Sequence, residues 1–482
     1  MVANMHKHIW VVLFLCVLVL GFVVRLYKIN NPIADWHAWR QADTSAVSRN
    51  FVLSGFDVLH PRFDDLSNVP SGLDNPKGYR FVEFPFYNVL QAGGYRIVGI
   101  LTLEEWGRLI TSITSLFSSL LLFLIVRKRC NERAGFFAAF FFLFLPYNIY
   151  YSRVILPDPM AVTAFLAAIY FFLIAIDKKL NFVSFSVSLF FAAASILIKP
   201  PAAFFLLPIA VLAYEAYGWK LVTKWYLWVF VLLSIGPFVA WRVWMSQYPE
   251  GIPVFAWLLN GGNIRFTGAY FYWIFADRFA RLILGYWGVV FFVFGVIRNY
   301  SRANVLFFFS FLASTILYLI IIARGNVQHD YYQIFIIPSL TLFMGLGVDL
   351  LLNKTKETTH VAQYAVVLIA SIFTFMFGWY FVRDYYNINN SSMLAAGQAV
   401  DKLTPKNAKI IAPLDGDTSF LYQTKRKGWA SFEKGLPEMI TMGAEYLVLL
   451  NPTQQDKEGL GKEYSIVALT PQYLILQLSQ KQ

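Results

Sequence analysis

Side chains that can bind an anion or move a proton recur in the short polar turns of this sequence. Lys and Arg bind phosphate groups, because they donate charge-assisted hydrogen bonds to the phosphate oxygens. A carboxylate among such cations can act as the general base that activates a hydroxyl group. The residues that suit this chemistry are Arg40, Asp43, Lys77, Arg153, Asp158, Lys199 and His329.

The segment 35–53 reads DWHAWRQADTSAVSRNFVL and has the periodicity of a helix. One helical face would carry residues spaced i, i+3, i+7, i+11 and i+14, namely Trp36, Trp39, Asp43, Val47 and Asn50. Tryptophans on one face are typical of a helix at the membrane–water boundary. Arg40 precedes Asp43 by three residues, which favours an ion pair between them. The segment is therefore either a plain interfacial helix with a solubilising pair or the carrier of a catalytic base.

The elements that must position these residues are membrane-spanning helices. The 482 residues are 58% hydrophobic and 14% charged, whereas soluble domains carry about 25% charge. Apolar runs of the roughly 20 residues that cross a bilayer recur along the chain. We expect about eleven spans, at 9–27, 108–126, 134–151, 159–176, 181–198, 201–217, 225–245, 281–297, 304–323, 332–352 and 361–382. Cys16 and Cys130 imply neither a disulfide framework nor a cysteine metal site.

Lys and Arg gather in alternate loops between these spans, which the positive-inside rule places in the cytoplasm. They are Lys7, Arg127, Lys128, Arg129, Arg133, Lys178, Lys179, Lys220, Lys224, Arg298, Arg302, Lys354 and Lys356. The net charge of +12 reflects this bias, and no basic stripe on a polar fold indicates nucleic-acid binding. We expect a multi-pass protein of the plasma (inner) membrane, with a cytoplasmic N-terminus and an extracytoplasmic or periplasmic C-terminus.

Two longer polar stretches fall on the outer side, a first loop at 28–107 and a tail that begins at 388. The tail predicts a small α/β domain with helices at 392–403 and 433–442 and strands at 408–412, 445–450, 464–469 and 473–478. It lacks a glycine-rich phosphate loop, so we interpret it as an accessory module and not a nucleotide site. The predicted domains are a transmembrane catalytic domain, 1–387, and an extracytoplasmic α/β domain, 388–482.

Each of the other outer turns also has a structural explanation. Asp158 before Pro159 suits a helix N-cap. Arg153 suits a side chain that reaches for the interface, and Lys199 suits a tight turn. Tyr331 and Tyr332 suit an aromatic belt. All these turns lie on one side of the membrane, however, and ionisable groups near a membrane usually mark function.

Several motifs resemble the GT-C superfamily of membrane glycosyltransferases, in the bacterial branch related to protein O-mannosyltransferases and the aminoarabinose transferase of lipid A. They lie within residues 9–385 and comprise His37-Ala-Trp39-Arg40-Gln41-Ala-Asp43-Thr44, Ser48-Arg49-Asn50-Phe51, Glu83-Phe84-Pro85, Arg153 with Pro157-Asp158-Pro159, and His329-Asp330-Tyr331-Tyr332. The resemblance implies interfacial helices in the first outer loop and a polyprenyl-phosphate sugar, such as an undecaprenyl-phosphate sugar, as donor. It also implies inverting transfer at the outer face to a lipid, glycan or protein acceptor. Asp43 would be the base and Asp158 the second acidic residue.

The motifs depart from the family pattern at two places. Thr44 follows Asp43 where many relatives have an Asp-Glu pair, and the downstream motif places Asp43 about one turn later than that pair. Asp35 therefore stays an alternative base. Phe84 stands where relatives often have lysine, which leaves a phosphate-binding role open to Lys77 or Lys199.

The expected substrate-binding residues are His37, Arg40, Lys77, Glu83, Arg153, Lys199, His329, Tyr331 and Tyr332. A single carboxylate among cations fits transfer from a lipid phosphate, which is already a good leaving group, better than a two-carboxylate hydrolase. Asp43, Asp158 and His329 are of metal-ligand type, but no spacing requires a divalent metal. The alternatives are a ligase or polymerase of lipid-pyrophosphate glycans, a transporter or flippase, and a scaffold whose tail binds a partner.

Overall fold

The computed structural model describes residues 9–177, 180–353 and 360–480, and its elements group into two compact units. One unit comprises 1–29, 108–241 and 255–384, and the other comprises 30–107, 242–254 and 385–482. Five of the cations used to predict orientation lie outside the described residues, namely Lys7, Lys178, Lys179, Lys354 and Lys356. The predicted orientation stays a prediction.

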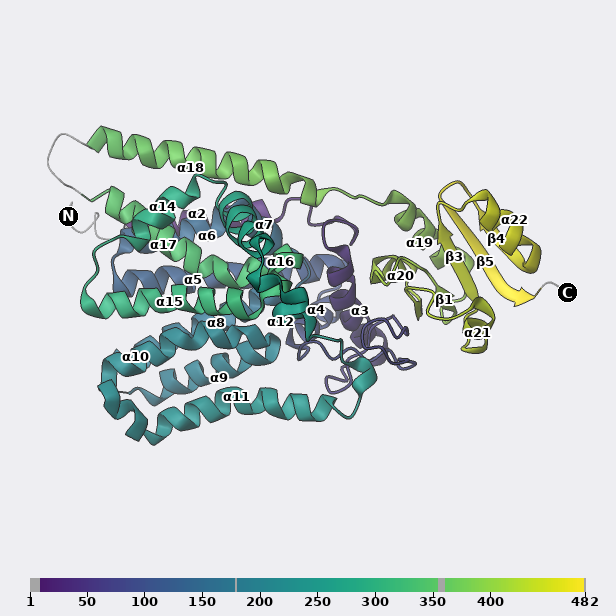
Figure 1. The fold of residues 1–482 in the computed structure, drawn as a ribbon, viewed down its shortest axis with the longest axis horizontal. Coiled ribbons are helices and arrows are strands. Elements are labelled where there is room, and N and C mark those ends of the chain that lie inside the picture. The colour runs from purple at the N-terminus through teal and green to yellow at the C-terminus, as the bar shows by residue number, and fades with distance from the viewer. Residues whose placement is uncertain (1–8, 178–179, 354–359, 481–482) are drawn as a thin grey trace. The chain divides into compact units, whose positions relative to one another are not determined.

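The first unit is helical and contains long helices that are apolar on all sides, as expected for helices that face lipid or one another. In chain order its helices are α2 (Ile9–Arg25), α5 (Leu103–Arg129), α6 (Glu132–Phe144), α7 (Pro146–Tyr151), α8 (Asp158–Asp177), α9 (Phe182–Ile198), η1 (Pro200–Leu206), α10 (Leu207–Tyr217), η2 (Gly218–Thr223), α11 (Trp225–Met245), α12 (Trp257–Asn260), η4 (Gly261–Phe266), α13 (Gly268–Phe271), η5 (Tyr272–Ile283), α14 (Gly288–Val296), α15 (Arg302–Ile321), α16 (Ala323–Gln328), η6 (Asp330–Ile336), α17 (Ile337–Leu351) and α18 (His360–Val382). Figure 1 shows α8, α9 and α10 packed side by side.

Within the described residues, seven helices are long and apolar enough to cross a membrane, or eight if one bent pair counts as a single span. Two shorter apolar helices, α2 and α9, add to these. The polytopic helical membrane fold is thus confirmed, while the number of eleven spans stays a prediction. The bent pair, 268–283 with 288–296, turns by 115°. Gly285 and Tyr286 cause this turn, since both have positive φ angles of 51° and 59° that end a right-handed helix.

Small residues let two central helices approach closely. A Cβ atom on Gly295 of α14 would lie 1.9 Å from the carbonyl oxygen of Phe343 on α17. A Cβ atom on Gly347 of α17 would lie 1.9 Å from the carbonyl oxygen of Phe291 on α14. Only glycine fits at these crossings, which is the usual way that membrane helices gain packing area.

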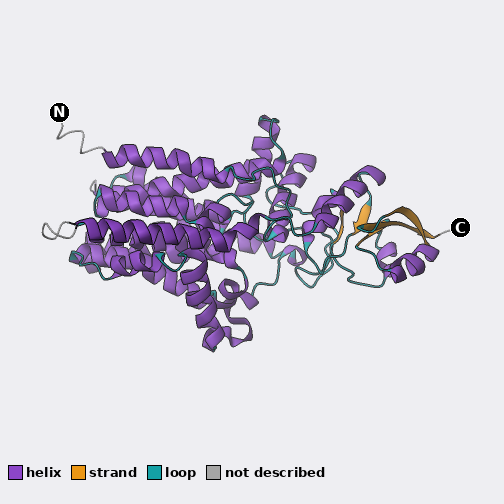
Figure 2. Cartoon of the chain, turned by 90° about the horizontal axis from the view of Figure 1, so that it is seen from above, coloured by secondary structure: helices purple, strands orange, loops and turns teal. Residues whose placement is uncertain are grey.

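The second unit combines two helices of the first outer loop with a mixed sheet, and Figure 2 shows the strands only near the C-terminus. Its elements are α3 (Ala38–Ser54), α4 (Phe86–Ile97), η3 (Pro249–Gly251), η7 (Arg383–Tyr386) at its edge, α19 (Ser391–Leu403), β1 (Lys409–Ile411), α20 (Thr418–Thr424), β2 (Lys427–Trp429), α21 (Leu436–Thr441), β3 (Tyr446–Leu450), α22 (Gln454–Glu463), β4 (Tyr464–Leu469) and β5 (Tyr473–Gln480). The strand order is β2-β1-β3-β5-β4, with β1 parallel to β2 and β3, and with β5 antiparallel to β3 and β4. The predicted small α/β region is confirmed.

The first outer loop continues this sheet at its β2 edge. Leu66 donates its backbone N–H to the carbonyl of Gly428 at 2.7 Å, and Gly428 donates to the carbonyl of Asp64 at 3.0 Å. The Asp65 carboxylate accepts the backbone N–H of Ala430 at 3.2 Å. The edge strand is therefore paired instead of open. The predicted division into domains 1–387 and 388–482 stays a prediction.

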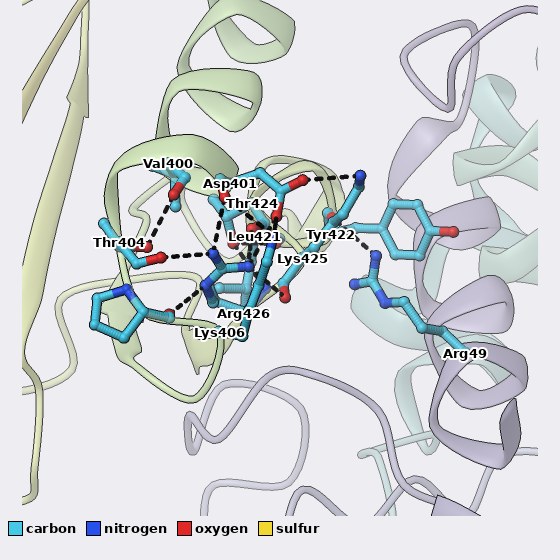
Figure 3. A network of polar contacts seen from close by, with 11 residues as sticks. Arg49, Val400, Asp401, Thr404, Lys406, Leu421, Tyr422, Thr424, Lys425 and Arg426 are labelled. Atoms are coloured by element: carbon cyan, nitrogen blue, oxygen red, sulfur yellow. Dashed lines mark hydrogen bonds and ion pairs between the residues drawn. The ribbon is translucent and has the colours of Figure 1, made fainter. Parts of the chain in front are cut away.

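A buried arginine anchors the end of α19 within the same unit (Figure 3). Arg426 donates to the Asp401 carboxylate at 3.1 Å and to the carbonyl of Thr404 at 3.0 Å. Lys425 and Lys406 also donate to Asp401. Burial alone would raise the pKa of Asp401, but these hydrogen bonds outweigh it and hold the pKa well below its usual range.

Candidate active site

Asp43 is the buried carboxylate of α3, with an exposed fraction of 2%. Its Oδ1 accepts a hydrogen bond from Thr418 Oγ1 at 2.6 Å, and its Oδ2 accepts one from Arg80 Nη2. Thr418 Oγ1 also lies 3.3 Å from the backbone oxygen of Trp39. The carboxylate is thus held by one donor from the first outer loop and one from α20. Both of its oxygens retain lone pairs for a further proton.

The predicted pair of Arg40 with Asp43 is wrong, because each finds another partner. Arg40 donates to Glu83, whereas Asp43 accepts from Arg80. In the helix and in the loop the arginine precedes the carboxylate by three residues, so the two pairs run in opposite directions along the two segments. The loop segment 80–83 therefore satisfies both ions of α3 at once.

Local pairing fixes the segment that delivers Arg80. Tyr79 pairs with Arg62 in an antiparallel bridge, and Arg80 donates its backbone N–H to Pro61 at 2.8 Å. The Asn75 side chain accepts from the Tyr79 N–H and donates to the Tyr79 carbonyl, both at 2.9 Å. This amide closes the turn before Arg80, as asparagine side chains commonly do.

Arg80 has two further nitrogen donors besides the Nη2 atom that contacts Asp43. Its side chain is 10% exposed, and among the described residues its Nε and Nη1 atoms are buried without a hydrogen-bond partner. Arg80 lines a small cavity of about 20 Å³, together with Arg40, Asp43 and Glu83. A buried guanidinium with free N–H groups is a strong site for an anionic oxygen.

A ladder of buried polar side chains fixes α3 against α4. Gln91 Nε2 donates to Ser45 Oγ at 3.1 Å, and Ser48 Oγ donates to Gln91 Oε1 at 2.7 Å. Asn88 donates to the carbonyl of Thr44 at 2.6 Å. Because such a network is satisfied in one arrangement of the two helices, it holds Asp43 in a defined place.

The remaining predicted residues of this unit lie around the start of α3. His37 takes a left-handed backbone with φ of 53° at the N-terminus of α3. Asp35, the alternative base, is buried and accepts from Gln41 Nε2 at 2.7 Å. Both line a second, larger cavity. Lys77 is exposed, with its ammonium 5.7 Å from the ring centre of Tyr79.

The helical unit holds the other predicted residues and brings two of them into contact. Asp158, the first residue of α8, forms an ion pair of 3.5 Å with Lys199. Asp158 is 1% exposed and Lys199 is 12% exposed. Lys199 itself ends α9. A buried carboxylate beside an ammonium group can bind or exchange a proton with a polar ligand.

Arg153 and the His329 motif occupy other turns of the helical unit. Arg153 is buried and donates to the carbonyl of Lys28 at 3.0 Å. The rings of His329, Tyr331 and Tyr332 stack in a group, with centres 4.7–6.1 Å apart. The substrate-binding roles expected for Arg153, Lys199 and His329 stay predictions.

Asp330 and three residues outside the predicted set take part in these arrangements. The Asp330 carboxylate accepts a hydrogen bond from Tyr151 Oη at 2.6 Å. Arg80 lies in a cationic stretch of the sequence and Tyr151 in a Tyr-rich turn, so composition signals both weakly. Nothing in the sequence points to Thr418, which reaches Asp43 across 375 residues. Within the described ranges, no three His, Cys, Asp or Glu residues are placed to share a metal ion.

Comparison with known proteins supports the expected resemblance. Residues 82–244 match the dolichyl-phosphate-mannose-protein mannosyltransferase family. No curated protein sequence is significantly similar to the chain.

Solved structures match over nearly the whole chain. ArnT from Cupriavidus metallidurans bound to undecaprenyl phosphate has 15% identity and a TM-score of 0.64, with 98% of both chains covered. The Archaeoglobus fulgidus oligosaccharyltransferase has 11% identity and a TM-score of 0.57, covering 92% of this chain and 70% of that one. The arabinofuranosyltransferase AftD from Mycobacteria has 12% identity and a TM-score of 0.58, covering 97% of this chain and 40% of that one. The resemblance is confirmed: the chain has the fold of the GT-C membrane glycosyltransferases and contains a segment that matches the mannosyltransferase family.

Proposed function

We propose that the protein is an inverting glycosyltransferase that takes its sugar from a polyprenyl-phosphate donor. The acceptor is a lipid, glycan or protein at the outer face of the plasma membrane. One observation carries this proposal: the buried Asp43 carboxylate, held by Thr418, contacts the Arg80 guanidinium, whose buried Nε and Nη1 atoms have no hydrogen-bond partner among the described residues. A base beside an anion site is what transfer from a lipid phosphate to a hydroxyl requires. The similar ArnT protein was solved with undecaprenyl phosphate, which supports this donor class.

The proposed reaction is a single displacement at the anomeric carbon. The acceptor oxygen forms a bond to that carbon, while its proton passes to the Asp43 carboxylate. The bond between the anomeric carbon and the phosphate oxygen breaks, and the polyprenyl phosphate leaves with the electron pair. Arg80 Nε and Nη1 stabilise the charge on the leaving phosphate, a role that the sequence had left to Lys77 or Lys199. Attack opposite the leaving group inverts the configuration.

The helical unit supplies a second group in this proposal. Asp158 and Lys199 form a buried pair at the end of two apolar helices, where a lipid head group would meet polar side chains. We assign the pair to substrate binding, together with Arg153, His329, Tyr331 and Tyr332. The finer expectations of eleven spans and a cytoplasmic N-terminus belong to the same proposal.

The test compares carboxylate variants in proteoliposomes. The assay measures release of undecaprenyl phosphate from a panel of undecaprenyl-phosphate monosaccharides, with undecaprenyl-pyrophosphate sugars as the competing donor class. We expect Asp43→Asn to lower turnover at least about 100-fold, the lower range of general-base contributions. The control is Asp57→Asn, at an exposed carboxylate whose side chain contacts only His60 among the described residues.

Two results would overturn the proposal. Wild-type turnover by Asp43→Asn together with loss in Asp35→Asn would move the base to Asp35. Turnover only with pyrophosphate-linked donors would replace the donor class by that of the ligases and polymerases. Arg80→Lys keeps the charge but loses the fork of N–H groups, so we expect a higher KM for the donor than in Lys77→Ala.

A further inference from the structure

A second cavity, larger than the one beside Arg80, lies within the unit that contains α3 and the sheet. Its volume is about 370 Å³, within the roughly 300–1,000 Å³ usual for ligand sites. One wall is the chain from Ala34 to Trp39, and the others are the linker before α19 and the loop between β1 and α20. The assigned reaction does not use this space.

The charge of its lining is one-sided. Three carboxylates line the cavity, those of Asp35, Asp415 and Asp417, and none of the described residues that line it is Lys or Arg. Asp415 is exposed, whereas Asp35 is buried. Carboxylates only accept hydrogen bonds when ionised, so this lining suits hydroxyl or ammonium donors and repels a phosphate. The donor head group is therefore excluded from this cavity.

An aromatic surface stands beside the carboxylates. Trp36 stacks on Tyr385 with ring centres 4.9 Å apart and an interplanar angle of 17°. Trp36 nevertheless stays 39% exposed, and the ring of His37 packs against it at 5.1 Å. Large aromatic faces next to convergent polar groups are a common arrangement for binding a ring with an apolar face and a polar edge.

The backbone around the cavity is strained at two places. His37 has φ of 53° and Asp415 has φ of 50°, both in the left-handed region that non-glycine residues rarely adopt. The two residues come from segments far apart in the sequence yet line the same cavity. Strained positions of this kind cluster at ligand sites, where surrounding structure holds them.

The cavity wall leads directly to the proposed base. Thr418 lies between the lining residues Asp417 and Ser419, and its hydroxyl contacts both the backbone oxygen of Trp39 and the carboxylate of Asp43. Asp43 itself lines the smaller cavity with Arg80. The proposed base thus lines the cavity beside Arg80 and is connected to the wall of the larger, acidic cavity through Thr418. In an inverting displacement the acceptor attacks one side of the anomeric carbon and the phosphate leaves from the other, so two separate cavities suit the two groups.

We propose that the larger cavity is the acceptor subsite and binds a neutral sugar ring, which stacks on Trp36 and donates its hydroxyls to Asp35, Asp415 and Asp417. The assignment of this cavity to the acceptor rests on the proposed function, but the binding of a sugar ring can be tested without turnover. It adds the substrate class that the fold alone does not give, a glycan-type acceptor in preference to an anionic head group.

Saturation-transfer NMR on the full chain in detergent tests this directly. The probes are four methyl glycosides, of glucose, mannose, galactose and xylose, with glucose 6-phosphate as the anionic counterpart. We expect at least one methyl glycoside to bind, with a signal at least fivefold lower in Trp36→Ala. Trp219→Ala removes an 80% exposed tryptophan of the helical unit and is the matched control. Glucose 6-phosphate should bind more weakly than the neutral sugars.

A second variant covers the case in which Trp36→Ala does not fold. Asp415→Asn combined with Asp417→Asn keeps the shape, since asparagine tolerates positive φ and can still cap α20. We expect this double variant to weaken the saturation-transfer signal of the methyl glycoside. The difference between the signals of the glycoside and of glucose 6-phosphate should become smaller. Absence of glycoside binding, equal signals in the two tryptophan variants, or equal binding of the phosphate ester to the wild type would overturn the proposal. Asp43→Asn should still bind the glycoside, so an active Asp43→Asn refutes the proposed base while leaving this subsite standing.

Discussion

The hydrogen bond from Thr418 to Asp43 makes a quantitative prediction about turnover. Thr418→Val replaces the hydroxyl by a methyl group of similar size and removes the 2.6 Å bond to Oδ1. A hydrogen bond to a charged group contributes about 1.5–3 kcal/mol. If Thr418 holds the carboxylate in its reactive place, the whole amount appears in the barrier. At 1.36 kcal/mol for each factor of ten, kcat falls about 10- to 150-fold.

The assay is single-turnover release of undecaprenyl phosphate at saturating donor, with the KM for the donor measured separately. We expect kcat to fall and the donor KM to stay unchanged, because Thr418 does not line the cavity beside Arg80. Thr418→Ser restores the hydroxyl and should recover most of the rate. A merely structural role of the side chain would not give this recovery.

A matched control uses the same contact between α20 and α3. Tyr422 Oη lies 3.0 Å from Ser45 Oγ and also contacts Glu104. Tyr422→Phe removes these two hydrogen bonds, neither of which involves the Asp43 carboxylate. The variant therefore tests whether any weakening of the contact between α20 and α3 lowers kcat. Equal losses in Thr418→Val and Tyr422→Phe, or a Thr418→Val rate equal to wild type while Asp43→Asn is inactive, would refute the reasoning.

Three further predictions concern stability, each followed by thermal unfolding in detergent. Burial raises the pKa of Asp65 to about 6, so this carboxyl disfavours folding increasingly as pH rises from about 4 to 6. Asp65→Asn should flatten the dependence of the free energy of unfolding on pH and raise this free energy by up to about 3 kcal/mol at neutral pH. Parallel curves of stability against pH for the variant and the wild type would contradict this. The pKa of Asp401 is lowered, so its stabilisation is present above about pH 4 and is lost as pH falls. Asp401→Asn should lower the free energy of unfolding by up to about 3 kcal/mol at neutral pH and change it little in acid. An equal loss of stability at both pH values would contradict this prediction. Gly347→Ala should prevent recovery of folded protein, since its Cβ atom would meet the Phe291 carbonyl, whereas Gly236→Ala, with nothing within 4 Å, should be tolerated.

The long helices could be predicted from the sequence because membrane insertion leaves few alternatives to a helix. The predicted span 225–245 coincides with α11, and 159–176 lies within α8. The span predicted at 281–297 missed the sharp turn at Gly285 and Tyr286. A single glycine in an apolar run is a weak signal, and this one is needed because its Cβ atom would lie 2.3 Å from the Thr374 carbonyl.

The helix that carries Asp43 was predicted from its periodicity, but the partners of its charges were not. Residues three apart on a helix are neighbours, so Arg40 seemed the natural partner of Asp43. The loop segment 80–83 offers both ions a partner from outside the helix, and these contacts depend on how the loop folds back. Likewise β2, with three residues around Gly428, is too short for its own sequence pattern and is defined by pairing with β1 and with Asp65.

The tail was interpreted as an accessory module because it lacks a glycine-rich phosphate loop, yet two of its features bear on Asp43. Its β2 edge is completed by residues of the first outer loop, and its helix α20 donates a hydroxyl to the Asp43 carboxylate. The donors from Thr418 and Arg80 hold both oxygens of this buried carboxylate in a fixed orientation. In the proposed mechanism the tail contributes to the chemistry through the side chain of Thr418, and it lines the larger cavity through the linker before α19 and the loop between β1 and α20, although no sequence motif marks either contribution.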